Sequence, residues 1–76
     1  MMEKTRIASV EPRPRGGFRV TDAAGVRYFT RNAWKASICK AAMEQGKSVL
    51  LTSYAGWYYR ELASVHLVEG ETSHAS

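Results

Sequence analysis

The order of its predicted elements is the feature that most constrains what this chain can fold into. Three β-like runs, one helix and two more β-like runs follow one another within 76 residues. A chain this short buries only about 60% of the surface that its unfolded form exposes, so nearly every apolar strand position must serve one core. We therefore expect a small five-stranded barrel formed by one domain over residues 1–69, with a disordered tail over residues 70–76.

The strongest local signal is a β-hairpin. The runs Phe18 to Thr21 and Val26 to Thr30 alternate in polarity around a short connection that ends in Gly25, as the strands of a hairpin do. Alternate residues of a strand point to opposite faces. The predicted inner face comprises Phe18, Val20, Val26 and Tyr28, and the predicted outer face comprises Arg19, Thr21, Arg27 and Phe29.

A strand and a basic loop are predicted before this hairpin. Lys4 to Glu11 has β character, with Ile7 and Val10 out of strict alternation in a way that a β-bulge accommodates. Two prolines and two glycines then occupy residues 12–17, which favours a loop because proline removes a ladder donor and glycine allows unusual dihedral angles. This loop exposes two cations, Arg13 and Arg15.

One helix is predicted after the hairpin. Asn32 is a favourable N-cap, Ala33 to Gln45 has helical periodicity, and Gly46 is a typical C-terminal stop. The predicted apolar stripe comprises Trp34, Ile38, Ala41, Ala42 and Met43, and it leaves the Cys39 thiol half-buried beside it.

Two further β-rich runs are predicted at Lys47 to Thr52 and at Tyr59 to Glu69. Between them, the segment from Ser53 to Trp57 is unusually rich in aromatic residues for a turn. Aromatic side chains here have an ordinary explanation, because they are strand formers that close small barrels. They are also suited to contact a ligand.

Positive charge is concentrated in the first half of the chain. The formal net charge is +4, but residues 1–40 carry +6 and residues 41–76 carry −2. Six of the nine cations in the first half are arginines, and the planar guanidinium group suits bidentate contact with phosphate. A nucleic acid or another anionic partner is therefore favoured, although scattered arginines also occur on ordinary solvated surfaces.

The element order and the hairpin GFRVTDAAGVRYFT resemble the oligonucleotide/oligosaccharide-binding (OB) fold, over roughly residues 4–69. The resemblance implies an all-β Greek-key barrel with one helix, whose ligand lies on the second and third strands between the first-to-second and fourth-to-fifth loops. The residues that fall at these places are Arg13, Arg15, Arg19, Arg27, Phe29, Tyr54, Trp57 and Tyr58.

Cations interleaved with aromatic rings suit single-stranded nucleic acid, because arginine neutralises phosphates while rings stack on unpaired bases. We expect binding with little sequence preference, DNA favoured, and self-association along the strand, since one small module covers few nucleotides. Phe29 has this role only in the register chosen above, because a slip of one residue would expose Tyr28 instead. The alternative is a protein-interaction module that uses Tyr54, Trp57, Tyr58 and an edge strand.

Other classes of function find little support in the sequence. One cysteine and two histidines at unrelated spacings do not form a metal site, and no pair of carboxylates is placed for acid-base catalysis. We predict a non-enzyme without catalytic residues, metal or cofactor. No apolar segment reaches membrane-spanning length, so we expect a soluble cytoplasmic protein without membrane contact. Its small size favours an accessory protein of a phage or mobile element.

Overall fold

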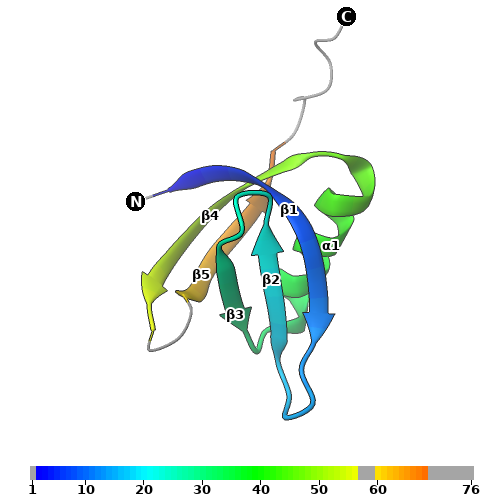
Figure 1. Ribbon diagram of the computed structural model, residues 1–76. Helices are drawn as coiled ribbons and strands as arrows, with labels where there is room; N and C mark the ends of the chain where they lie inside the picture. The colour runs from blue at the N-terminus through cyan, green and yellow to red at the C-terminus, as the bar shows by residue number, and fades with distance from the viewer. Residues whose placement is uncertain (1, 57–59, 69–76) are drawn as a thin grey trace, which may run out of the picture.

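Five strands and one helix make up the fold, which we describe from a computed structural model for residues 2–56 and 60–68 (Figure 1). In chain order they are β1 (Glu3–Pro12), β2 (Phe18–Asp22), β3 (Arg27–Thr30), α1 (Ala33–Gln45), β4 (Ser48–Ala55) and β5 (Arg60–Leu67). This is the predicted order.

The strands form a closed barrel in the order β1-β2-β3-β5-β4. Only the β3–β5 pair is parallel, and β1 reaches two partners because its first half pairs with β4 and its second half with β2. A shift of register between Ile7 and Ser9 lies where β1 changes partner, which confirms the predicted bulge. The predicted five-stranded barrel with one helix is thus confirmed, and it is consistent with an OB-like barrel. The expected edge strand is wrong for the described residues, because closure gives every strand two neighbours.

The β2–β3 hairpin has the predicted register. Arg19 pairs with Phe29 and Thr21 pairs with Arg27, while Val20 and Tyr28 are buried. The prediction for Val26 is wrong: its side chain is 37% exposed, and the residue lies in the turn before β3 begins. β3 starts one residue later than predicted because the backbone N–H of Val26 donates a hydrogen bond to Asp22 within the turn.

Asp22 organises that turn from inside the barrel. Its Oδ1 accepts hydrogen bonds from the backbone N–H groups of Ala24 at 3.0 Å and Val26 at 2.9 Å. Its Oδ2 accepts from the hydroxyls of Tyr28 at 3.2 Å and Thr5 at 3.3 Å. Asp22 is only 4% exposed, and its carboxylate accepts these four hydrogen bonds, which is about the number that two carboxylate oxygens can accept.

Burial, and then the nearby Asp22 carboxylate, raise the pKa of the Tyr28 hydroxyl from 10.0 to about 12. The folded state therefore favours the neutral phenol. The stability that this preference contributes is fully present below pH 10 and is lost as the pH rises toward 12.

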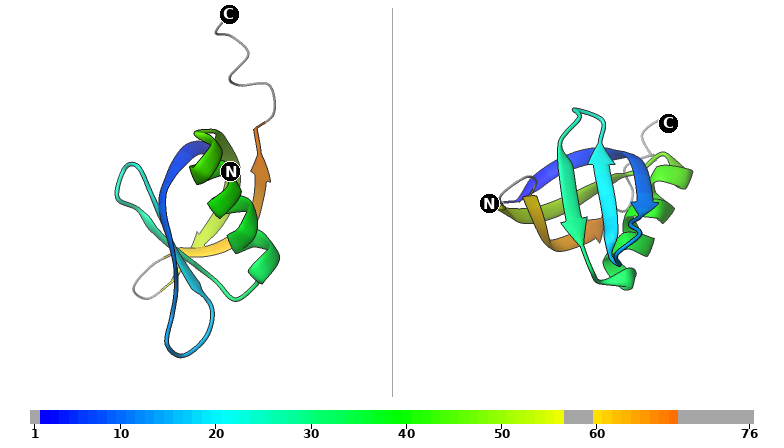
Figure 2. Two further views of the ribbon diagram at one scale, coloured as in Figure 1. Left: turned by 90° about the vertical axis from the view of Figure 1, so that its right-hand side faces the viewer. Right: turned by 60° about the horizontal axis from the view of Figure 1, so that its bottom comes forward.

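The helix has the predicted ends. Asn32 Oδ1 accepts from the backbone N–H groups of Trp34 and Lys35, and Gly46 ends the helix with a φ of +69°. The buried stripe differs from the predicted one: it is made of the small residues Ala36, Cys39 and Ala42, with Ile38 and Met43 partly buried beside them. Small side chains let the helix approach the barrel closely, where it packs chiefly against β1 and β5 (Figure 2).

Two predictions for the helix are therefore wrong. Trp34 is exposed, and Cys39 is fully buried instead of half-buried. Burial raises the pKa of the Cys39 thiol to about 11, so the neutral thiol is favoured over the thiolate at neutral pH.

Predicted strand ends also require corrections. Pro12 closes β1 by pairing with Phe18, although we placed it in the loop; proline is tolerated at a strand end. Tyr54 lies within β4 and pairs with Glu61, although we predicted a turn there. Trp57, Tyr58 and residues 70–76 lie outside the described residues.

Candidate nucleic-acid interface

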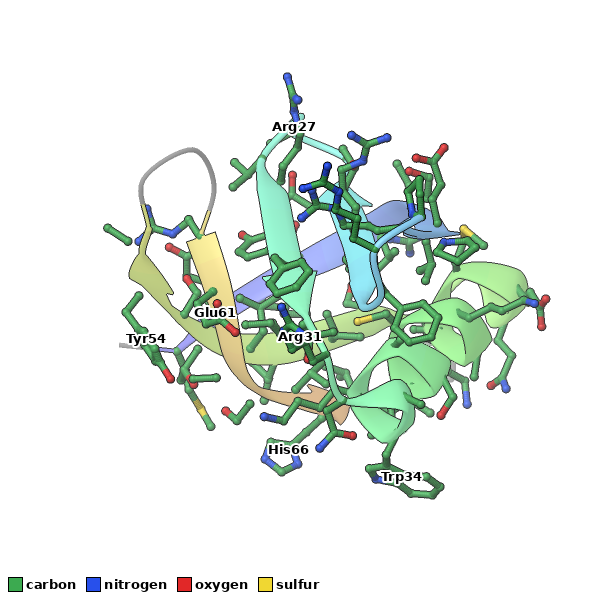
Figure 3. All side chains as sticks on the ribbon, turned by 90° about the horizontal axis from the view of Figure 1, so that it is seen from below. Arg27, Arg31, Trp34, Tyr54, Glu61 and His66 are labelled. Carbon is green, nitrogen blue, oxygen red and sulfur yellow. The ribbon has the colours of Figure 1, made fainter. Side chains whose placement is uncertain are left out.

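A single row of side chains crosses the outside of the barrel. Glu11 pairs with Arg19, Arg19 with Phe29, Phe29 with Glu61, and Glu61 with Tyr54. Residues in register on neighbouring strands point to the same face. We call these five residues the transverse row; it alternates acid, base, aromatic ring, acid and aromatic ring from β1 to β4. Figure 3 shows Glu61 and Tyr54 on their adjoining strands.

Phe29, in the middle of this row, lies close to two cations. The Arg13 guanidinium carbon lies 5.1 Å from the centroid of the Phe29 ring, and that of Arg31 lies 5.8 Å from it. Both distances fall within the range of cation–π attraction. We call Arg13, Gly17, Phe29 and Arg31 the Phe29 cluster.

Gly17 belongs to this cluster because its missing side chain makes room for the ring. A Cβ atom at position 17 would lie 2.6 Å from the Phe29 Cε1 atom. The backbone of Gly17 also has a φ of +80°, which L-residues rarely adopt. The basic loop and the aromatic ring of β3 are thus packed together, although they are separate in sequence.

Arg31 was missing from the predicted site. It follows Arg27 and Phe29 at intervals of two along the chain, which is the spacing that keeps residues on one side of an extended segment. This alternation was an available signal. Arg31 lies one residue beyond Thr30, where β3 ends, so alternation within the strand alone does not include it.

Carboxylates reduce the positive character of this face. Arg19 donates a hydrogen bond of 2.7 Å to Glu11 Oε1, and Glu61 is the neighbour of Phe29 in the β3–β5 pairing. An exposed ion pair of this kind contributes only about 0–1 kcal/mol, so a phosphate can replace Glu11 as the partner of Arg19. Arg19 must exchange this carboxylate to bind a ligand, whereas Arg15 is exposed in the β1–β2 loop.

The other predicted site residues are spread over the barrel and do not belong to the Phe29 cluster. Arg15 is exposed in the β1–β2 loop, and Tyr54 is 58% exposed on β4. Arg27 points away from the barrel near the turn of the hairpin (Figure 3), and its side chain makes no hydrogen bond or ion pair with the described residues. The structure thus gathers Arg13, Arg19 and Phe29 of the predicted set and leaves Arg27 toward the far end of β3.

The role of Gly17 can be tested against its neighbour. Gly16 also has a positive φ, of +101°, but a Cβ atom there would meet nothing within 4 Å. Alanine should cost roughly 1–3 kcal/mol of backbone strain at either position, whereas only Gly17→Ala should also displace the Phe29 ring. We expect Gly17→Ala to lower the urea midpoint further and to shift the Phe29 ring resonances in NMR spectra. Equal midpoints and unchanged ring resonances in the two variants would contradict the packing described above.

Searches against protein-family models and curated proteins found no match for this chain. Within residues 2–56 and 60–68, no three His, Cys, Asp or Glu side chains lie where they could hold a metal ion together. No helix in the same part of the chain is long and apolar enough to span a bilayer.

Proposed function

We propose that this protein binds single-stranded nucleic acid, DNA favoured, with little sequence preference, through the outer face of β2 and β3. The observation that carries the proposal is the Phe29 cluster, in which two guanidinium groups lie within cation–π distance of one partly buried aromatic ring. Stacking of an unpaired base on such a ring contributes about 1–3 kcal/mol and tolerates every base.

The two arginines have different parts in this proposal. Arg13 belongs to a loop, so its guanidinium can leave the ring for a phosphate and open one face of Phe29 to a base. Arg31 immediately follows β3, and it contacts the next phosphate while its planar group continues the stack. Arg15, Arg19 and Arg27 add phosphate contacts, and Tyr54 adds a further ring on β4. A stacking role for Trp57 and Tyr58 stays a prediction from the sequence.

The OB-like architecture supports this location. In OB folds the ligand commonly lies across the second and third strands, beside the first-to-second loop. Here Phe29 lies on β3, and Arg13 and Gly17 belong to the β1–β2 connection. Because the described barrel is closed, we infer that copies associate through side chains along a shared strand of nucleic acid instead of through strand edges. Such neighbour contacts would give the cooperativity that small single-strand-binding modules show.

A protein-interaction module is the second candidate, and the transverse row favours it. Two carboxylates, Glu11 and Glu61, alternate with the cation and rings of this row, and Tyr54 is well exposed. Mixed charge around exposed tyrosine is suited to a protein partner. Salt separates the two functions, since phosphate contacts release counterions and protein contacts respond weakly.

The test is fluorescence polarisation with labelled oligo-dT, oligo-rU and a duplex over a range of salt. If Arg13, Arg31 and one further arginine together neutralise about three phosphates, the slope of log affinity against log salt should be near −2, or a loss of roughly 20-fold between 50 and 200 mM. Oligo-dT should bind more tightly than the duplex. Absence of binding at low salt would overturn the proposal and favour the protein-interaction module.

A further inference from the structure

Trp34 is the most exposed large hydrophobic residue of the described chain. Its side chain is 72% exposed in the first turn of α1, and it points away from the barrel (Figure 3). Its backbone is held on both sides: the N–H donates to Asn32 Oδ1 at 2.9 Å, and the carbonyl accepts from Ser37 Oγ at 2.8 Å. The indole is thus displayed from a fixed point of the fold.

Folding does not explain this indole. The helix is attached to the barrel through Ala36, Cys39 and Ala42, and Trp34 lies outside that stripe. Tryptophan is on average highly buried and is enriched where proteins bind ligands and partners. A ligand that covers the indole would account for its position.

Trp34 is connected to the Phe29 cluster through Arg31. The Arg31 guanidinium lies 5.8 Å from the Phe29 ring centroid, and Trp34 follows Arg31 by one short connection. The Cα atoms of Phe29 and Trp34 cannot be more than about 18 Å apart, because a fully extended residue spans at most 3.6 Å. A stacked strand rises about 3.4 Å per nucleotide, so about five nucleotides or fewer cover this distance.

The charge near Trp34 identifies the ligand as anionic. The first turn of α1 contains no acidic residue, and the N-terminus of a helix carries partial positive charge. Arg31 and Lys35 flank the indole in sequence, and Lys35 Nζ donates to the Ala63 carbonyl at 2.6 Å, which holds this cation at the junction of α1 and β5. Arg31 near Phe29 and the positive end of the helix at Trp34 thus place positive charge at both ends of this path, as binding of a nucleic-acid backbone requires.

We propose that Trp34 is a second base-stacking platform, so that the nucleic acid runs from Phe29 across Arg31 onto the first turn of α1. This inference rests on the proposed function and adds to it a direction and a minimum length. Oligonucleotides long enough to reach both rings gain affinity from Trp34. Shorter ones engage one ring at a time.

The test combines affinity with the fluorescence of the indole itself. Trp34→Ala should weaken binding of a ten-nucleotide oligo-dT by about five- to a hundredfold, the range expected for one stacked base. Trp34→Phe should retain most of the affinity, and Gln45→Ala, at the opposite end of the helix, should be unchanged. In Trp57→Phe, where Trp34 is the remaining tryptophan, oligo-dT should quench the emission with the midpoint seen by polarisation.

The outcomes separate the two proposals. If the wild-type protein binds oligo-dT but Trp34→Ala binds equally well and Trp34 emission does not change, the second platform is overturned while the proposed function stands. The exposure of Trp34 would then indicate a contact with a protein partner. If the wild-type protein binds no oligonucleotide at low salt, the proposed function is overturned and the second platform with it.

Discussion

Asp22→Ala should lower the free energy of unfolding by roughly 3–5 kcal/mol, because it removes the shared acceptor of four hydrogen bonds and leaves a buried tyrosine hydroxyl without its partner. A loss of this size is a large fraction of the total stability of a small domain. The variant should be largely unfolded in mild urea, as circular dichroism would show. The stability of Asp22→Asn should lie between that of the wild type and that of Asp22→Ala, because an amide keeps one acceptor oxygen but cannot accept on its nitrogen.

A double-mutant cycle with Tyr28→Phe separates the loss of the Asp22 acceptor from the cost of leaving the Tyr28 hydroxyl without a partner. Removing the hydroxyl as well as the carboxylate leaves no orphaned phenol in the barrel, so the double variant should lose less than the sum of the single losses. Tyr28→Phe should also abolish the part of the alkaline destabilisation between pH 10 and 12 that comes from Tyr28. Additive losses, or an Asp22→Ala protein as stable as wild type, would show that Asp22 does not organise the barrel.

Phe29→Ala should weaken oligo-dT binding by about five- to a hundredfold, since one stacked base contributes about 1–3 kcal/mol. Phe29→Tyr should retain binding, because the tyrosine ring keeps the stacking surface. Arg13→Ala and Arg31→Ala should each reduce the magnitude of the salt slope by about 0.7, the change expected for one phosphate contact on a single strand. Polarisation at several salt concentrations measures both effects.

Lys40→Ala is the matched control for the arginine variants, because it changes the net charge by the same amount at an exposed position of the helix. It should leave the slope almost unchanged. Thermal unfolding of Phe29→Ala should show that the variant is folded, since the ring is only partly buried. A folded Phe29→Ala protein with wild-type affinity would exclude Phe29 as a stacking platform.

Local patterns in the sequence were sufficient for the elements and for part of the site. Alternation around Gly25 predicted the register of the hairpin, so Arg19 and Phe29 were placed together correctly. Asn32 and Gly46 predicted both ends of the helix. Capping and alternation depend on residues close in sequence, and for this reason they can be interpreted without knowledge of the fold.

The same patterns failed where a residue had two compatible environments. Aspartate at position 22 is a residue type typical of turns, yet its carboxylate points into the barrel and accepts hydrogen bonds from Tyr28 and Thr5. Trp34 fits an apolar helical stripe, but the helix instead uses smaller side chains to approach the strands. Periodicity identifies an apolar position, whereas the space available opposite it is set by the packing partner.

What the sequence by itself determined is therefore the order of strands and helix, the hairpin register and the basic, aromatic character of β2 and β3. Closure of the barrel decided the rest. It placed Glu61 beside Phe29 through the parallel β3–β5 pair, and the packing of Gly17 brought Arg13 onto the same ring. These contacts join segments distant in the chain, so they depend on which strands become neighbours, a property of the whole fold that no local stretch of sequence encodes.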